Sequence, residues 1–219
     1  LNSNGIYTEP VKKTTFKASN DNYQGDWQID RTTRWKARGM VEVTYNLSSV
    51  KMQSVNDRDV LFVVDNSEGM SGSKLDRVQR DLKQTIYELI NGTNNRAALV
   101  SFNETGNILS GFSSNITELY SDVNGMTASG ERSYNAGLQS ALSLLNTYQK
   151  QAGTDLVMVF ITDGRPTREV SAGNATYLLL KDTQPALTIN AIQLETGNIV
   201  YDEVVSISDN QFISSNEML

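Results

Sequence analysis

One short apolar run limits the fold of this chain more than any other feature. Residues 60–64 read Val-Leu-Phe-Val-Val and are followed at once by Asp65. A continuous apolar run of this kind is typical of a strand that is buried on both faces, as in the centre of a parallel sheet. Small and polar residues follow, and a helical pattern begins near Ser73. The pattern predicts an α/β fold with a carboxylate at the carboxyl end of a central strand, where open α/β sheets bind their ligands.

From residue 58 onward, helical and strand patterns alternate along the chain. Apolar residues recur at steps of three and four through residues 75–90, which indicates an amphipathic helix that ends near Gly92. Further strands are expected at residues 96–102, 108–112, 155–162, 188–193 and 204–208, and helices from residue 115 and around residues 134–148. A short gap precedes the strand at 108–112, so we expect a hairpin and an antiparallel edge strand. The alternation predicts a doubly wound, mostly parallel sheet with helices on both faces.

Residues 1–57 differ from the rest, and we expect a small β-rich extension ahead of an α/β domain at residues 58–219. Residues 40–47 alternate apolar and polar side chains, and a second short strand is expected near Trp27. Lysines and arginines gather in this extension, which fits a polyanion-binding surface or, as we favour, a solvated strand face. Residues 216–219 are typical of a helix start, so we expect the last helix to be cut short.

Composition excludes several classes of function. The chain has 219 residues without cysteine or histidine, which excludes disulfides, thiolate chemistry, zinc–cysteine sites and the commonest general base. Any metal would therefore be a hard cation held by oxygen atoms. A net charge of −6 disfavours nucleic acid, and no apolar run approaches the ~20 residues that span a bilayer, so we expect no membrane contact. The chain begins with Leu1, and we interpret it as a processed or excised piece.

Three short motifs follow one another at predicted strand and helix ends. They are Asp-Asn-Ser-Glu-Gly-Met at residues 65–70, Gly-Glu-Arg-Ser-Tyr-Asn-Ala-Gly-Leu at residues 130–138, and Ile-Thr-Asp-Gly at residues 161–164. In this order they resemble the von Willebrand factor type A domain, whose metal-ion-dependent adhesion site begins with Asp-x-Ser-x-Ser and continues with Gly-Gly-Thr-Asn and Thr-Asp-Gly. The resemblance covers residues 58–219.

The resemblance implies a metal site that is altered in this chain. In the family, side chains of the three motifs surround a divalent cation, usually Mg²⁺. Asp65, Ser67 and Asp163 match the family's ligands. Gly69 takes the place of the second serine, and Arg132 takes the place of the threonine. Glycine has no side chain and a guanidinium has no acceptor, so neither can ligate a cation through its side chain.

Our hypothesis is that Arg132 replaces the divalent cation, so that no cofactor is expected. Two neighbouring carboxylates need a counter-cation, and the planar donors of arginine suit them, so Arg132 would pair with Asp65 or Asp163. The residues expected to complete this network are Glu68, Glu131 and Ser133. In the alternative, Arg132 points to solvent, Ser133 or Thr127 stands in for the threonine, and Mg²⁺, Mn²⁺ or Ca²⁺ still binds.

Enzymatic interpretations find little support in the sequence. Phosphotransfer enzymes that use an aspartate after a buried strand usually carry a second aspartate two residues on, where this chain has Ser67. A glycine-rich phosphate loop is missing from the sequence. A Ser67–Lys74 nucleophile pair and an Asp65–Asp163 acid–base pair have no further support. We therefore expect a protein that is not an enzyme.

The resemblance implies a protein-binding module instead. The lack of cysteine and the β-rich extension are similar to the type A domains of Gram-positive cell-wall proteins and pilus-tip adhesins. Such a protein is secreted to the bacterial cell surface, and its partner is a host matrix or cell-surface protein or another surface or pilus subunit. The remaining alternative is a structural spacer in a surface fibre. An exposed apolar patch would favour binding over spacing.

Overall fold

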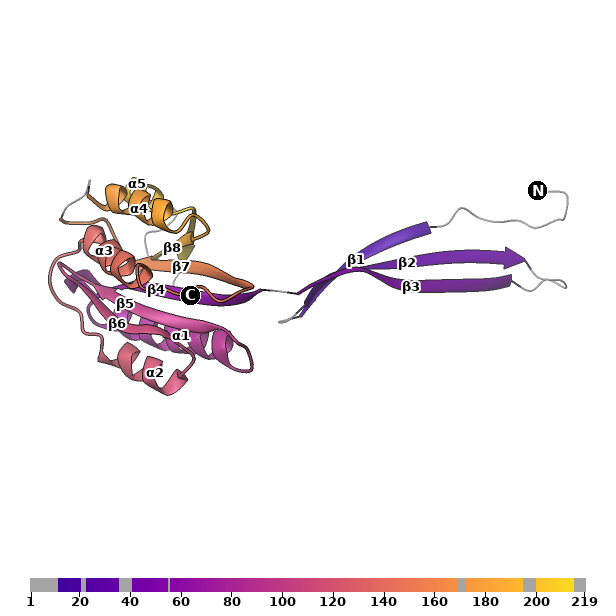
Figure 1. The fold of residues 1–219 in the computed structure, drawn as a ribbon, viewed down its shortest axis with the longest axis horizontal. Coiled ribbons are helices and arrows are strands. Elements are labelled where there is room, and N and C mark those ends of the chain that lie inside the picture. The colour runs from indigo at the N-terminus through magenta and orange to yellow at the C-terminus, as the bar shows by residue number, and fades with distance from the viewer. Residues whose placement is uncertain are drawn as a thin grey trace. The chain divides into compact units, whose positions relative to one another are not determined.

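The computed structural model divides the chain into two compact units, with the division between Asn56 and Asp57. It describes residues 12–20, 23–35, 41–54, 56–168, 172–194 and 200–214. The first unit is an antiparallel sheet of β1 (Lys12–Asn20), β2 (Tyr23–Trp35) and β3 (Val41–Ser54), in that order (Figure 1). The strand predicted near Trp27 falls within β2, and the strand predicted at residues 40–47 coincides with β3 from Val41 onward. The side chains of this unit, including the basic cluster and both tryptophans, lie outside the described part.

The second unit is built on a six-stranded sheet with the order β6-β5-β4-β7-β8-β9. Its strands are β4 (Asp57–Asp65), β5 (Arg96–Phe102), β6 (Gly106–Ser113), β7 (Thr154–Thr162), β8 (Thr188–Leu194) and β9 (Asn210–Ser214). Every neighbouring pair is parallel except β5 and β6, which form the expected antiparallel hairpin at one edge. The predicted fold class is therefore confirmed.

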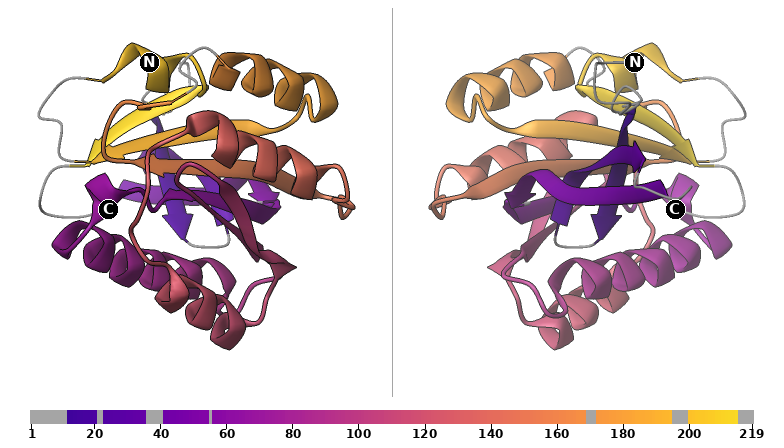
Figure 2. Two further views of the ribbon diagram at one scale, coloured as in Figure 1. Left: turned by 90° about the vertical axis from the view of Figure 1, so that its left-hand side faces the viewer. Right: turned by 90° about the vertical axis from the view of Figure 1, so that its right-hand side faces the viewer.

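Helices cover both faces of this sheet (Figure 2). α1 (Ser73–Ile90) and α2 (Ile116–Gly125) share one core, and α3 (Tyr134–Leu145) and α4 (Ala172–Thr183) share the other. The buried residues of α1 recur at steps of three and four, which puts them on one side of the helix; they are Leu75, Val78, Leu82, Ile86 and Ile90. Among the described residues, no helix is both long enough and apolar enough to cross a membrane.

The region after β8 differs from the sequence-based prediction. The strand predicted at residues 204–208 is wrong, because α5 (Asp202–Val205) begins there and the edge strand is β9. Val204 and Ile207 are both buried and Val205 is exposed. A spacing of three is helical, but an apolar segment of only five residues is too short for its pattern to distinguish a helix from a strand. The helix start predicted at residues 216–219 lies outside the described residues.

The site is positioned by the central pair of strands, β4 and β7. They are parallel neighbours, and Val64 pairs with Ile161 in their register. Parallel strands end at the same edge of a sheet, so Asp65 at the end of β4 and Asp163 just after β7 come to one place. The apolar run of β4 is buried throughout, which fixes this edge to the core.

Candidate functional site

Asp65 is the innermost residue of the site and is fully buried. Its Oδ1 accepts a hydrogen bond from the backbone N of Ser67 at 2.8 Å, and its Oδ2 accepts one from Thr162 Oγ1 at 2.7 Å. The same Oδ2 also accepts from Nε of Arg132. A buried carboxylate is stable only when its oxygens are hydrogen-bonded and its charge is balanced, and Asp65 meets both requirements.

Arg132 lies between the two aspartates, and its side chain is only 10% exposed. Nε donates to Asp65, Nη2 donates to Oδ1 of Asp163, and Nη1 donates to the carbonyl oxygen of Arg165 at 3.0 Å. Burial lowers the pKa of Arg132, but the negative charges of Asp65 and Asp163 raise it, and the net shift is upward. The guanidinium is therefore a permanent positive charge that joins both carboxylates.

The backbone of Arg132 is held by the loop that follows β7. Its carbonyl oxygen accepts hydrogen bonds from the backbone N of Thr167 at 2.9 Å and of Arg168 at 3.1 Å. Its own N donates to Thr167 Oγ1 at 3.0 Å. Next to it, the hydroxyl of Tyr134 donates to the carbonyl oxygen of Gly164. Strand β7, its loop and the start of α3 therefore fix the arginine together.

Two glycines give the guanidinium its space. A Cβ atom on Gly69 would lie 2.6 Å from Nη2 of Arg132, and one on Gly164 would lie 2.7 Å from Nη1. Real Cβ atoms do not approach other atoms so closely. Both nitrogens at the end of the arginine therefore lie against a residue without a side chain.

A second cation, which was not predicted to belong to the network, reaches the same site. Lys74 lies in the first turn of α1, and its Nζ donates to Oδ2 of Asp163 at 2.7 Å and to the carbonyl oxygen of Gly69 at 3.4 Å. The Asp163 side chain is 4% exposed and that of Lys74 is 32% exposed. The feature of the sequence that could have identified Lys74 is its position in the helix that directly follows the first motif, at the same edge of the sheet.

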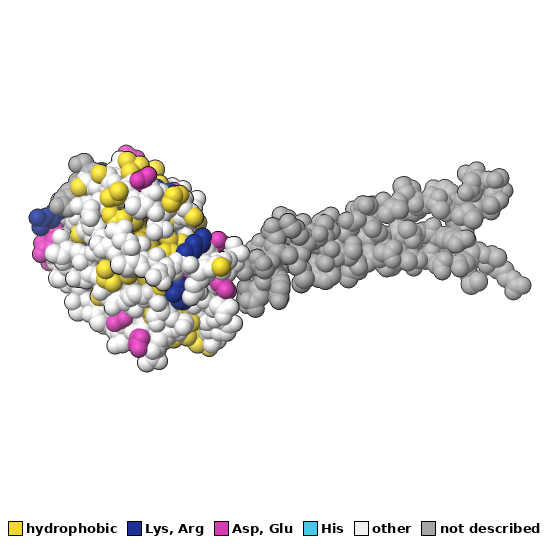
Figure 3. Space-filling view, in the orientation of Figure 1, with side chains coloured by type: hydrophobic (Ala, Val, Ile, Leu, Met, Phe, Trp, Pro, Cys, Tyr) yellow, Lys and Arg dark blue, Asp and Glu magenta, His cyan; other side chains and the backbone are white. Residues whose placement is uncertain are grey.

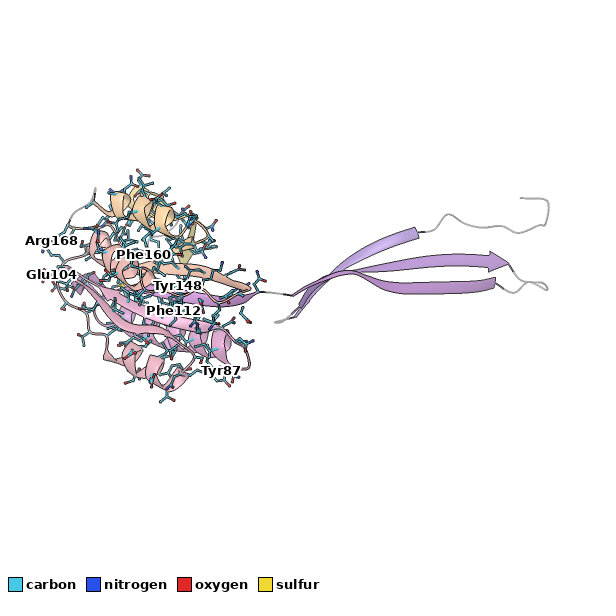
Figure 4. The ribbon with its side chains drawn as sticks, in the orientation of Figure 1. Tyr87, Glu104, Phe112, Tyr148, Phe160 and Arg168 are labelled. Atoms are coloured by element: carbon cyan, nitrogen blue, oxygen red, sulfur yellow. The ribbon has the colours of Figure 1, made fainter. Side chains whose placement is uncertain are left out.

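Neither predicted glutamate completes the network. Glu131 instead forms an ion pair with Arg168, whose Nε lies 3.3 Å from Oε2, and Arg168 also lies 3.4 Å from Glu104 (Figure 4). Glu68 is exposed. A third carboxylate would add negative charge to a site that already holds two, whereas Lys74 balances it.

Ser133 has a structural position, and the alternative that depends on it fails in part. Ser133 is buried, and its Oγ accepts a hydrogen bond from the backbone N of Ala136 at 3.2 Å, which caps α3. Thr127 is exposed. The version of the alternative in which Arg132 points to solvent is wrong, because the side chain is buried against the two aspartates.

The arrangement of donors does not fit a hard divalent cation. The guanidinium of Arg132 lies where it bonds one oxygen of each carboxylate, and Gly69 offers no side-chain oxygen. Within the described residues, no group of three or more acidic side chains is placed to hold a metal ion. One observation favours a metal site instead. Oγ of Ser67 is buried and has no hydrogen-bond partner among the described residues.

One of the two enzymatic pairings, that of Ser67 with Lys74, is not formed as a hydrogen bond. Because Ser67 Oγ has no hydrogen-bond partner in the described part, it is not bonded to Lys74. A groove of about 650 Å³ lies at the amino-terminal ends of β4, β7 and β8, where it is lined by Val60, Val157 and Thr188 among others. That end of the sheet is opposite to Asp65.

Comparison with known proteins shows which family and which solved structures this chain resembles. The family model described as "von Willebrand factor type A domain" matches residues 60–165. No curated protein matches the chain. The fold is shared with the vWF domain of the type V pili tip protein Mfa5 from Porphyromonas gingivalis, with a TM-score of 0.61 and 13% identity over 74% of this chain and 90% of that one.

Two further structures are similar over more of the chain. The PilB minor pilin from Streptococcus sanguinis has a TM-score of 0.60 and 11% identity over 95% of this chain and 74% of that one. A von Willebrand factor type A protein from Catenulispora acidiphila has a TM-score of 0.63 and 13% identity over 96% of this chain and 46% of that one.

The class of protein follows from the fold and the family match together. The fold is a doubly wound α/β sheet with one antiparallel edge, and it carries paired aspartates at the ends of its central strands. The chain contains a von Willebrand factor type A domain, in the unit that begins at Asp57.

Proposed function

We propose that this domain is a non-catalytic protein-binding module of a bacterial cell-surface or pilus protein, in which Arg132 takes the place of a divalent cation. The observation that carries the proposal is the buried guanidinium, which donates to Asp65 and to Asp163 at once. Its charge balances carboxylates that a metal would otherwise balance.

The occurrence of similar structures among pilus proteins favours a role at the cell surface. Two of the similar structures are those of a pili tip protein and a minor pilin. We infer secretion to the cell wall or pilus of a Gram-positive bacterium, with a host matrix protein, a host cell-surface protein or another pilus subunit as partner.

The chemistry of the site favours binding over catalysis. The sequence has neither histidine nor cysteine, and Asp65 is committed to three hydrogen bonds. A general base must be free to accept a proton from substrate, and both oxygens of Asp65 already accept hydrogen bonds from the protein.

Exposed apolar side chains favour a binding module over a spacer. Leu178 on α4 is 60% exposed, and Leu179 and Val205 are also exposed. Figure 3 shows hydrophobic side chains over α4 and α5 on the face that it presents. Apolar area that faces solvent is costly, and it commonly marks a contact surface.

Adhesion in the absence of metal tests the function directly. Beads that carry the full chain are scored for attachment to fibronectin-, collagen- and fibrinogen-coated surfaces and to host cells, in EDTA and in 5 mM Mg²⁺ (roughly the millimolar range for weak sites). We expect attachment that is equal in both buffers and is lost on uncoated surfaces. Attachment to none of these surfaces would favour the spacer.

Thermal unfolding tests the state of the site. A cation that binds only the folded chain raises its stability by about 2.7 kcal/mol at a hundredfold excess over Kd. We expect the full chain to unfold at the same temperature in EDTA, Mg²⁺ and Mn²⁺. The variant that carries both Arg132→Thr and Gly69→Ser, which restores the family's residues, should respond to the metal.

A second candidate is an adhesion site that still holds a metal. The buried Oγ of Ser67, which has no partner among the described residues, favours it, because an unpaired buried hydroxyl is a typical ligand position. This candidate predicts that the unchanged chain is stabilised by Mg²⁺ or Mn²⁺, and that attachment is weaker in EDTA.

A further inference from the structure

Gly69 has no backbone reason to be a glycine. The glycines with positive φ in the described residues are Gly72, Gly92, Gly130 and Gly153, and Gly69 is not one of them. Other residues can adopt its backbone conformation without strain. The reason for glycine must therefore be space.

The space at Gly69 is taken by the guanidinium. A Cβ atom there would lie 2.6 Å from Nη2 of Arg132, and 3.4 and 3.5 Å from the two carboxylate oxygens of Asp163. The last two distances are ordinary or nearly ordinary contacts, so the arginine alone would be displaced.

The arginine cannot easily give way. Its Nη1 lies on the opposite side, where a Cβ on Gly164 would be 2.7 Å away, and it donates to the carbonyl oxygen of Arg165. Its Nε is bonded to the buried Asp65. A shift away from Gly69 would break one of these bonds or press on the loop after β7.

We infer that Gly69 is the residue that selects which cation this site holds. Without a side chain at position 69 there is room for the guanidinium of Arg132. A side chain at that position excludes it, and a serine also adds a hydroxyl close to Asp163, where the oxygens of Asp65 and Ser67 already suit a hard divalent cation. The inference rests on the proposed replacement of the metal by Arg132.

The test changes the neighbours of Arg132, first with the arginine present and then without it. Full-chain variants Gly69→Ser, Gly69→Ala and Gly164→Ala are compared with the unchanged chain, and Gly69→Ser in an Arg132→Thr background is compared with Arg132→Thr alone. Unfolding is followed by far-UV circular dichroism, because every described helix belongs to the second unit, and Mn²⁺ binding is followed by the electron paramagnetic resonance signal of the free ion.

We expect all three single variants to lower Tm in EDTA by about 5 °C, as overpacking does in a domain of this size. Mn²⁺ should bind and restore Tm only in Gly69→Ser, because the other two create the clash without offering an oxygen. In the Arg132→Thr background, Gly69→Ser should cost nothing in EDTA, because the clash is gone. If Gly69→Ser gives no folded protein in EDTA, recovery by refolding in Mn²⁺ is the readout.

Three results would overturn the inference. In the first, Gly69→Ser leaves Tm unchanged and binds no Mn²⁺. In the second, Gly69→Ser lowers Tm by the same amount with and without Arg132. In the third, Gly69→Ser is destabilised or fails to refold whether or not Mn²⁺ is present, while the variant that also carries Arg132→Thr responds to Mn²⁺. Residue 132 alone would then select the cation. Binding of Mn²⁺ by the unchanged chain is a different result, because it removes the proposed function itself.

Discussion

Nζ of Lys74 lies 2.7 Å from Oδ2 of Asp163, on the carboxylate oxygen that Arg132 does not use. Asp163 therefore accepts from two cations, one on each oxygen. With Asp65 included, two carboxylates face two single positive charges. This is the same total charge that a divalent cation would supply, divided between a buried arginine and a lysine that is one-third exposed.

Loss of Lys74 should destabilise the domain modestly. Lys74→Met leaves one oxygen of the nearly buried Asp163 without its charged donor, and we expect a loss of about 1 kcal/mol in the free energy of unfolding. Urea denaturation followed by circular dichroism measures it. Lys83→Met is the matched control, since Lys83 lies on the same helix and bonds only to the side chain of Asn124 in the described hydrogen bonds, and it should change stability by less than about 0.5 kcal/mol. Equal losses in the free energy of unfolding for the two variants would show that the contact between Lys74 and Asp163 does not stabilise the site.

Loss of Arg132 should destabilise the domain far more. Arg132→Met leaves Asp65 and Asp163 buried without their shared cation, which costs about 3–5 kcal/mol for a buried pair. Arg132→Lys keeps the charge but has one nitrogen, which cannot reach two carboxylates and a carbonyl together, so we expect an intermediate loss. The same urea experiment measures both. A loss below about 1 kcal/mol for Arg132→Met would show that the ion pairs contribute little.

The sequence was sufficient for strands β4 to β8 and for the location of the site, but not for the edge strand β9 or for the contacts of the site. The buried run before Asp65 and the similar run before Asp163 are continuous and apolar, so tertiary packing agrees with local pattern there. Helix α4 was not predicted, because its buried residues are Gly173, Thr176 and Leu180. Two of these are small or polar, so the sequence of α4 lacks the apolar stripe that predicts an amphipathic helix.

The chemistry of the site shows the same limit. The sequence indicated that Arg132 would pair with one of the two aspartates, and the structure has it bonded to both. Lys74 is far from Asp163 in the chain, and their contact depends on how α1 begins relative to β7. The clash that excludes a side chain at Gly69 exists only in three dimensions.

A second buried ion pair, at the other end of β4, should also be important for stability. Asp59 is fully buried, accepts from Nε of Arg96 at 2.8 Å and from its Nη2 at 2.6 Å, and accepts from the hydroxyl of Tyr148 at 2.7 Å. The ring of Tyr148 also packs on Phe112 (Figure 4). Tyr148→Phe keeps this ring contact and removes one hydrogen bond to a charged group, so we expect a loss of about 1.5 kcal/mol by urea denaturation. An unchanged stability would mean that water replaces the hydroxyl.

Asp209, which lies just before β9 and contacts both α4 and β8, should make stability depend on pH. Asp209 accepts from the N of Ile189 at 2.8 Å, from Lys181 at 2.9 Å and from Tyr177 at 3.1 Å. Burial raises the pKa of Asp209, but the bonds from Ile189 and Lys181 lower it more, and the net shift is downward. A carboxyl with a lowered pKa stabilises the fold above its ordinary pKa of 3.8 and loses that contribution as pH falls through the lowered value.

The Asp209→Asn variant isolates this contribution. At pH 7 we expect it to be less stable than the unchanged chain by about 1 kcal/mol. The difference should shrink steadily below pH 3.8, because the unchanged chain then loses the same charge. Urea denaturation at several pH values measures it, and a difference that stays constant from pH 7 to pH 3 would contradict the assignment.

The order of strands in the sheet affects how the domain folds during its synthesis. β4 pairs with β5 on one side and with β7 on the other, while β5, β6 and the first two helices all precede β7 in the chain. During synthesis, β4 therefore has one partner early and lacks the other until β7 has emerged. Until then its apolar run presents an unpaired edge, which is a ready template for aggregation. We expect nascent chains that end before Thr154 to depend on chaperones, and the two aspartates of the site to meet only once β7 has paired with β4.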